Sequence, residues 1–392
     1  MNVHMPERLR SRRSGTRMRQ VLMTAFQPDW RLPARLPAML HAAGCEVTAF
    51  APLNSHARRS GYVRRYMAAP SDTNEYFDAL CLHLESDADR YTWVLPATDA
   101  DVRGLYARRH EAWAAEVFPA NAASPDANAV VSKLHFAKLL DRLGVATPRS
   151  RAVRSVEEAQ AAALEIGFPV ILKPSEGWAG SGTMRADNVA GVARAFTRAT
   201  GQGEVIVQRF HTGRVGSAMA VYCGGYLNGW VTAYKLLTFP GPYSPSCYRV
   251  FRPLPAIEPP LRAIGKTLGL HGVMGFDFIE DAETGAITFL ELNPRPGAIA
   301  YTFAATGVSP EEMLGGLIGH AAPAVAPQPA VDISLPLFPQ DLVRGIQQSD
   351  WLSLISFVTA PREWRDVPWR EPRLLAAELR TLFWHARDRL LR

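Results

Sequence analysis

The chain has 392 residues, of which 47% are hydrophobic and 20% are charged. This length suffices for two or three packed domains, and the composition is typical of a globular protein rather than a disordered one. The net charge of +6 does not indicate a nucleic-acid binder, because the first 19 residues hold six arginines and one glutamate and the remainder carries only +1. A nearly neutral body lacks the basic surface that DNA or RNA binding requires.

The basic arm, residues 1–19, has no apolar stretch of the kind that a secretory signal needs. Two interpretations stay open: a disordered arm, or a native start at Met18 that leaves the arm outside the protein.

The four cysteines lie far apart without zinc spacing, which favours reduced, structural thiols. No apolar run of about 18 residues occurs, so we expect a cytoplasmic protein without stable membrane insertion.

Strand and helix patterns alternate in the N-terminal part of the chain. Strands are predicted at 20–26, 46–51 and 91–95, and helices at 32–43, 75–84 and 100–110. This alternation predicts an α/β domain with a doubly wound parallel sheet over residues 20–123. No Gly-x-Gly-x-x-Gly follows the first strand, so a dinucleotide site is not expected. Asp99 is predicted to be a helix N-cap, with contact to substrate as the alternative.

Residues 124–330 show a mixed pattern. Helices are predicted at 124–143, 156–167 and 189–200, and strands up to Lys173 and at 204–210, 216–222 and 227–235. The segment 238–255 is rich in Pro, Gly and Ser and is predicted to be a loop that closes over a site. From residue 331 to residue 392 we expect a mostly helical extension. Its last helix, 373–392, is amphipathic, and both packing on the body and attachment to a membrane surface are open interpretations.

A β-hairpin with two facing carboxylates is the most informative feature of the chain. Apolar runs flank a polar turn at 281–285, and a turn centred on Thr284 places Asp277 directly opposite Glu291. The period of two along a strand puts Asn293 on the face of Glu291. Two facing carboxylates about 5 Å apart repel each other unless a cation lies between them. Two carboxylates and an amide are oxygen ligands that suit Mg²⁺, with Mn²⁺ as the substitute.

A glycine-rich loop follows a lysine in an apolar strand. Lysine occurs only five times in the chain, against 38 arginines, so each lysine is a candidate for a site that needs a compact ammonium. Lys173 interrupts an otherwise apolar run, where an unpaired charge would be costly. The residues after it include Gly177, Gly180 and Gly182, whose backbone amides can turn toward a polyphosphate. The lysine precedes the glycines, so this is not a Walker loop.

These elements in this order resemble the ATP-grasp superfamily. The resemblance rests on a strand ending in Lys-Pro, a Gly-rich loop, a Gln-x-aromatic stretch and a hairpin ending in Glu-x-Asn-Pro-Arg, and it covers roughly residues 124–319. It implies a two-lobed α+β ATP-grasp fold over 124–330, with a lid lobe at about 150–210. The preceding α/β unit is similar to the domain that usually comes before an ATP-grasp pair.

The resemblance also implies roles for individual residues. Binding of ATP phosphates is implied for Lys133 and Lys173, with Ser181 and Gly182 covering the β and γ phosphates. The stretch from Gln208 through Arg209 to Phe210 matches the segment whose backbone reads the adenine edge. Magnesium ligation is implied for Asp277, Glu291 and Asn293. Stabilisation of the transferring phosphoryl group or acyl phosphate is implied for Arg295, with Lys235 as a further phosphate contact. One departure is the segment 213–217, which lacks the glutamate that often holds the ribose.

The implied function is that of a carboxylate-amine ligase. Phosphoryl transfer to a carboxylic acid suits these residues, because cations neutralise the developing charge and the loop excludes water. The resemblance adds that an amine then attacks the acyl phosphate, with small molecules such as amino acids as substrates. A homodimer is compatible with this interpretation. The alternatives are a carboxylase of the biotin carboxylase type and an ATP-binding sensor without turnover. Arg249 and Arg252 are interpreted either as substrate-carboxylate contacts or as solvated surface residues.

Overall fold

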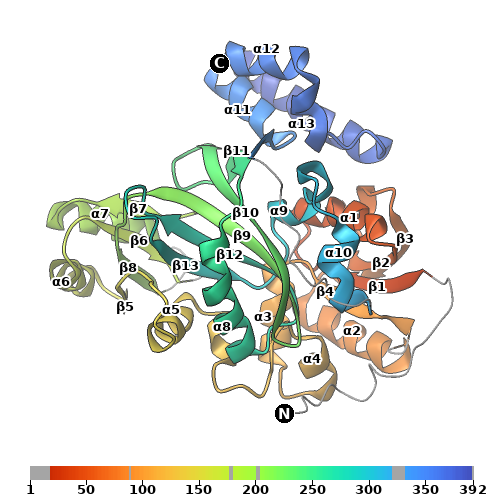
Figure 1. Cartoon of the computed structure of the whole chain (residues 1–392), viewed down its shortest axis with the longest axis horizontal. Helices are drawn as coiled ribbons and strands as arrows, with labels where there is room; N and C mark the ends of the chain where they lie inside the picture. The colour runs from red at the N-terminus through yellow and green to blue at the C-terminus, as the bar shows by residue number, and fades with distance from the viewer. Residues whose placement is uncertain (1–17, 88–89, 176–179, 200–203, 320–331, 391–392) are drawn as a thin grey trace.

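The computed structural model describes residues 18–87, 90–175, 180–199, 204–319 and 332–390. Three sheets and a C-terminal group of helices make up this part of the chain (Figure 1). The predicted arm falls almost entirely outside the described residues, as does part of the glycine-rich loop. Among the described residues, no helix combines the length and the apolar character needed to cross a membrane.

The N-terminal sheet is parallel throughout, as predicted, with strand order β3-β2-β1-β4. In chain order, β2 and β3 are added on one side of β1, and β4 is added on the other side. The strand order therefore reverses between β1 and β4. Ligands of such sheets bind at this reversal, outside the carboxyl ends of the strands. The strands are β1 (Arg19–Thr24), β2 (Cys45–Pro52), β3 (Val63–Ala69) and β4 (Trp93–Pro96), and the helices are α1 (Leu36–Ala42), α2 (Thr73–Asp87), α3 (Asp99–Ala107) and α4 (Ala112–Val117).

The central sheet has six antiparallel strands in the order β13-β12-β9-β10-β11-β14. One face packs on α5 and α8 and the other on α1, α9 and α10, so both faces lie in hydrophobic cores. The strands are β9 (Arg214–Cys223), β10 (Tyr226–Thr238), β11 (Ser246–Phe251), β12 (Gly272–Glu280), β13 (Ile287–Asn293) and β14 (Ile333–Pro336). The helices are α5 (Lys133–Arg142), α8 (Glu258–Leu268), α9 (Ala298–Tyr301) and α10 (Pro310–Leu314).

A smaller four-stranded sheet, in the order β5-β8-β6-β7, forms the second lobe. Two helices, α6 and α7, supply its separate apolar core (Figure 1). The strands are β5 (Ser150–Val153), β6 (Val170–Pro174), β7 (Met184–Ala186) and β8 (Val205–Arg209), and the helices are α6 (Val156–Ile166) and α7 (Val189–Ala199). The predicted two-lobed arrangement after a parallel-sheet unit is confirmed, whereas the domain limits in residue numbers stay a prediction.

Helices also form the C-terminal extension, which lies at the end of the molecule beyond β11 (Figure 1). We call residues 340–390 the C-terminal lobe. It contains α11 (Gln340–Gln348), α12 (Trp351–Thr359), a 3-10 turn (Pro361–Asp366) and α13 (Pro372–Leu390). The last helix packs on the body through one face, where Leu374 and Ala377 are buried. The prediction that this helix packs on the body is therefore confirmed for that face.

Three sequence predictions are wrong in detail. The single helix predicted at 124–143 is instead a 3-10 turn (Ala127–Val130) and α5, because the Ser132 hydroxyl accepts from the His135 amide and starts a new helix there. The loop predicted at 238–255 contains β11 and is therefore much shorter. The N-cap of α3 is Thr98, not Asp99, since the side chains of Thr98 and Asp101 form a capping box.

Candidate active site

The facing carboxylates of the hairpin are confirmed: Asp277 of β12 pairs directly with Glu291 of β13, and Gly275 pairs with Asn293. The register shifts by one residue between Asp277 and Phe278, which pairs with Phe289. This bulge changes which side chains of β13 share a face. Residues two apart on a regular strand share a face, so Phe289 would otherwise point into the site with Glu291. The bulge instead allows Phe289 to be buried in the apolar core.

Asp277 is held by a neighbouring strand. Ser217 of β9 lies opposite it, and the Ser217 hydroxyl donates a hydrogen bond of 2.5 Å to Asp277 Oδ1. Burial raises the pKa of Asp277, and Lys235 on β10 offsets part of that increase. Glu291 raises the same pKa further, because two adjacent negative charges disfavour each other. A cation bound near Asp277 would oppose these two effects.

Glu291 is surrounded by lysines. Lys133 is the first residue of α5, and its Nζ lies 3.7 Å from Glu291 Oε2. Burial alone would raise the pKa of Glu291, but the charges of Lys133 and Lys173 outweigh it and lower that pKa to about 2. Burial in turn lowers the pKa of Lys173 to about 8, against the opposing effect of Glu291. Lys133 and Lys173, predicted from distant parts of the sequence, therefore meet at one carboxylate.

The donor set fits a hard divalent cation. Asp277 and Glu291 face each other across the hairpin, and Asn293 lies two residues from Glu291 on the same strand and face. Among the described residues, no group of three His, Cys, Asp or Glu side chains is placed to hold a metal. Two carboxylates and an amide leave most of a six-coordinate shell to water or to phosphate oxygens, which is the usual way in which proteins bind Mg²⁺.

Arg249 is a buried guanidinium next to these carboxylates. It lies on β11 opposite Lys235, and its charge lowers the pKa of Asp277. The residue is 8% exposed, and its Nε and Nη1 have no hydrogen-bond partner among the described residues. Tyr301 lies nearby, and burial raises the pKa of that phenol, with the Arg249 guanidinium opposing the shift. Buried donors without acceptors are costly, so an anionic ligand is the natural partner here.

Arg252, the other arginine considered from the sequence, is placed differently. Its guanidinium is exposed and bonded to Asp332. Of the two interpretations left open by the sequence, the surface one therefore applies to Arg252, whereas Arg249 faces the site.

The glycine-rich loop and the loop after β10 touch each other. A Cβ added to Gly180 would lie 1.9 Å from the Tyr243 carbonyl oxygen, and the φ of Gly180 is +71°. Gly182 also has a positive φ and lies against Pro174 at the end of the Lys173 strand. Ser181, between them, is exposed. Glycine is thus required where these two loops meet, by backbone conformation and by space.

In the segment 208–210, predicted to contact adenine, several polar groups already form hydrogen bonds within the protein. The backbone amide of Arg209 donates to Arg149 and that of Phe210 donates to Pro169. The Gln208 amide donates to the Ser150 hydroxyl over 3.0 Å. Reading of an adenine edge at this segment would therefore use its other backbone groups.

Arg295 bridges the central sheet and the N-terminal sheet. Its Nη2 donates to Asp99 Oδ2 over 2.7 Å, and its guanidinium lies 4.8 Å from the centre of the Trp30 ring. Trp30 follows β1 and Asp99 follows β4, so both lie at the reversal point of the parallel sheet. Arg295 Nε and Trp30 Nε1 are buried donors without partners among the described residues. Buried donors without acceptors among the described residues are therefore present where the central sheet meets the N-terminal sheet.

Sequence reasoning missed Ser217 as a site residue and left the role of Arg249 open. Ser217 reaches Asp277 only through the pairing of β9 with β12, and these strands are about 60 residues apart in the chain. Arg249 lies in a segment whose Pro and Gly content hid a strand. The sequence signal for this strand is the period of two that places Cys247, Arg249 and Phe251 on one face.

Comparisons with known proteins agree with this arrangement. Residues 132–214 match the family described as carbamoyl-phosphate synthase L chain, ATP binding domain. The D-alanine–D-alanine ligase of Stutzerimonas stutzeri is 29% identical over 177 residues, which are 43% of this chain and 56% of that ligase. The chain thus spans little more than half the length of this curated relative.

Solved structures extend the similarity over most of the chain. N5-carboxyaminoimidazole synthase from Aspergillus clavatus, in complex with ADP and 5-aminoimidazole ribonucleotide, is similar with a TM-score of 0.62 and 13% identity, over 81% of each chain. L-amino acid ligase from Bacillus licheniformis is similar with a TM-score of 0.55 and 15% identity, over 76% of this chain and 74% of that one. The chain has the ATP-grasp fold. Its resemblance to the ATP-grasp superfamily, inferred from the motifs, is confirmed.

Proposed function

We propose that this protein is an ATP-dependent, Mg²⁺-dependent ligase that joins a carboxylic acid to an amine through an acyl phosphate. The observation that carries the proposal is the pair Asp277 and Glu291, facing each other and surrounded by lysines. Such a group of cations and carboxylates suits a metal-bound polyphosphate. The similar D-alanine–D-alanine ligase and L-amino acid ligase are named for ligation.

In this proposal the lysines bind the nucleotide. Lys133 and Lys173 bind its phosphates, and the loop with Ser181 and Gly182 covers them and excludes water. Asp277, Glu291 and Asn293 hold Mg²⁺, which when bound neutralises charge on the phosphate oxygens. Gln208 through Phe210 contact the base.

Arg249 orients the acid substrate. Its charge acts on Asp277, so a carboxylate bound by Arg249 would lie near the proposed metal ligands. A carboxylate oxygen attacks the γ-phosphorus and ADP leaves. Lys235 and Arg295 stabilise the negative charge of the transferring phosphoryl group. An amine then attacks the acyl carbon, loses a proton, and phosphate leaves, so no protein nucleophile is needed.

The place where the parallel sheet meets the central sheet is the proposed place for the substrates. Trp30, Asp99 and Arg295 are in contact there, and Trp30, Arg249 and Arg295 have buried donors without partners among the described residues. Donors of this kind favour substrates with carboxylate groups, and Asp99 offers an acceptor for an ammonium group. Amino acids carry both groups, so we propose amino acids or short peptides as the substrate class.

The test is a screen for ADP release with pairs of small acids and amines. The ligase requires ADP formation that depends on both an acid and an amine and that yields their amide in mass spectrometry. Turnover dependent on bicarbonate would instead establish a carboxylase of the biotin carboxylase type. Nucleotide binding without ADP under any acceptor would establish a sensor, and either result overturns the proposal.

Glu291→Gln tests the site itself. The change removes one of two metal carboxylates, and we expect ADP formation to fall by at least about 100-fold, as for loss of a charged group at a reacting centre. Glu283→Gln is the matched control, because Glu283 is an exposed residue in the turn of the same hairpin. Both variants should keep the circular dichroism spectrum of the parent. Near-normal turnover of a folded Glu291→Gln variant would remove the basis of the site assignment.

A further inference from the structure

From residue 351 onward, the arginine side chains of the C-terminal lobe are exposed and most acidic side chains are buried. Residues 351–389 are all described, and each of their seven arginines is exposed, whereas four of their five acids are buried. Asp388 is the single exposed acid of this segment. The exposed arginines are Arg362, Arg365, Arg370, Arg373, Arg380, Arg387 and Arg389. The outer surface of the lobe is therefore strongly basic, although the segment as a whole carries only a small net charge.

The buried acids are occupied in fastening the lobe to the body. Asp366 pairs with Arg35 of the N-terminal domain, and Glu378 with Arg31. Glu371 accepts from the Ser60 hydroxyl and the Gly61 amide. Two other acids pair with exposed arginines, Glu363 with Arg362 at 3.5 Å and Asp388 with Arg387 at 3.2 Å.

The exposed residues of α12 and α13 also include large apolar side chains. On α12 they follow helical spacing, and Leu352 is 81% exposed. On α13 Phe383 is 64% exposed and Trp384 is 50% exposed. The full set is Trp351, Leu352, Ile355, Val358, Trp369, Leu379, Phe383 and Trp384. Leu379, Phe383 and Trp384 lie within one and a half turns of α13, and clustered exposed apolar side chains mark a binding surface for a protein or a membrane.

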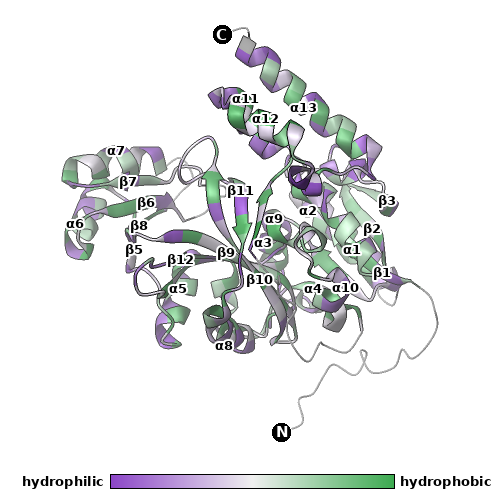
Figure 2. Cartoon of the chain, turned by 45° about the horizontal axis from the view of Figure 1, so that its top comes forward, coloured by the Kyte–Doolittle hydropathy of each residue, from purple (hydrophilic) through white to green (hydrophobic). Residues whose placement is uncertain are grey.

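Along α13 hydrophobic and hydrophilic residues alternate (Figure 2). Leu379 and Phe383 lie one turn apart, and Arg380 and Arg387 lie beside them on the exposed side. The Arg387 guanidinium lies 3.9 Å from the centre of the Trp384 ring. Aromatic and aliphatic residues bordered by arginine are typical of helices that lie in the interface of an anionic bilayer.

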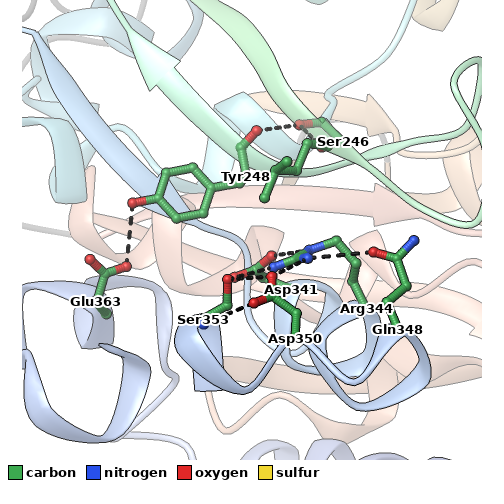
Figure 3. Close-up of polar contacts among 9 residues, drawn as sticks. Ser246, Tyr248, Asp341, Arg344, Gln348, Asp350, Ser353 and Glu363 are labelled. Atoms are coloured by element: carbon green, nitrogen blue, oxygen red, sulfur yellow. Dashed lines mark hydrogen bonds and ion pairs between the residues drawn. The ribbon is translucent and has the colours of Figure 1, made fainter. Parts of the chain in front are cut away.

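The exposure does not come from a loosely attached helix. Arg344 of α11 donates to Asp341 and Asp350, and its Nη2 donates to the Ser353 hydroxyl of α12 (Figure 3). Tyr248 of β11 donates to Glu363 over 3.5 Å, which ties the lobe to the central sheet. The lobe is thus held rigidly while its apolar surface faces outward.

We propose that the outer surface of the C-terminal lobe, and α13 in particular, docks this protein on an anionic lipid membrane. The exposed face of α13 carries Arg380 and Arg387 beside its apolar residues, so two copies of this face would bring like charges together, which argues against a face-to-face dimer. A polyanion such as RNA would use the arginines but would gain little from the aliphatic side chains of α12. A bilayer with anionic headgroups satisfies both, since acyl chains cover the apolar residues.

The experiment is co-sedimentation of the full chain with phosphatidylcholine vesicles, with and without phosphatidylglycerol. We expect binding to the anionic vesicles that weakens as salt is raised, because salt screens the arginines. Phe383→Ser/Trp384→Ser should weaken binding at least about tenfold, given the apolar area removed. Arg380→Gln/Arg387→Gln should weaken it by about fivefold per arginine. The matched control is Leu82→Ser/Leu164→Ser, which alters two equally exposed leucines on α2 and α6.

Three outcomes overturn the proposal. The first is a parent protein that stays in the supernatant with anionic vesicles. The second is self-association without lipid that the Phe383→Ser/Trp384→Ser variant abolishes, which would make the surface a dimer interface. The third is equal binding of that variant and the parent to anionic vesicles and to heparin, which would make the lobe a site for polyanions. Thermal unfolding of every variant with the parent midpoint excludes misfolding as the cause.

Discussion

At the scale of single residues, burial and pairing separate side chains of the same type. Arg249 and Arg252 are three positions apart, yet Arg249 has two buried nitrogens without an acceptor among the described residues, whereas Arg252 pairs with Asp332 in solvent. A buried unpaired guanidinium lowers the stability of the folded state and is retained where a ligand uses it. Burial correspondingly lowers the pKa of Arg249.

Arg249→Met is therefore expected to raise the KM for the acid by on the order of 100-fold, because charge-assisted hydrogen bonds are lost. The KM for ATP should change little. The free energy of unfolding should rise by about 1 kcal/mol, since a buried charge is replaced by an apolar side chain of similar length. Steady-state kinetics and urea unfolding measure the two effects, with Arg252→Met as the control that changes neither KM. A loss of stability with an unchanged KM would mean that Arg249 is structural.

At the scale of elements, the glycine-rich loop depends on its contact with the loop after β10. Gly180 and Gly285 have nearly the same φ, +71° and +70°, but a Cβ meets Tyr243 at the first position and nothing within 4 Å at the second. Two alanine substitutions can thus separate backbone strain from the loop contact.

Gly180→Ala is expected to raise the KM for ATP roughly tenfold or more, because the loop that covers the phosphates can no longer close against its neighbour. Gly285→Ala has the same backbone cost, about 1 kcal/mol, and should leave the KM for ATP unchanged. Initial rates at varied ATP measure both. Equal effects of the two substitutions would show that the loop contact has no part in nucleotide binding.

At the scale of the whole molecule, buried ion pairs join the C-terminal lobe to the N-terminal domain. The Arg35 guanidinium contacts Asp366 at 2.5 Å and lies 4.7 Å from the centre of the Tyr301 ring. Tyr301 is in turn next to Arg249, so the lobe, the N-terminal domain and the candidate site share one cluster. Burial raises the pKa of Asp366 to about 6, and Arg35 opposes that shift.

Asp366→Asn is expected to lower the free energy of unfolding by about 3 kcal/mol, because Arg35 is left buried without its counter-charge. Asp332→Asn removes the partner of the exposed Arg252 and should cost less than about 1 kcal/mol. Urea unfolding followed by circular dichroism compares the two variants. Equal costs would mean that the buried pair does not hold the lobe in place.

The local pattern of the sequence was sufficient for much of the fold and for the centre of the candidate site. The alternation of strands and helices predicted the parallel sheet, since each element shows its buried face in its own periodicity. The sequence predicted that Asp277 faces Glu291 from a hairpin turn centred on Thr284. In the structure the centre of the turn lies half a residue earlier in the chain. The bulge next to Asp277 compensates, so the predicted pair is correct although the pairs nearer the turn are shifted.

Other features depend on contacts between distant segments. No local pattern shows that Ser217 reaches Asp277, that Arg295 meets Asp99, or that Arg35 pairs with Asp366. The sequence by itself determined the residue types and the element periods, because those depend on near neighbours. Only the tertiary structure decided which charges are paired and which stay unpartnered, because burial and register are set by the packing of whole sheets against one another.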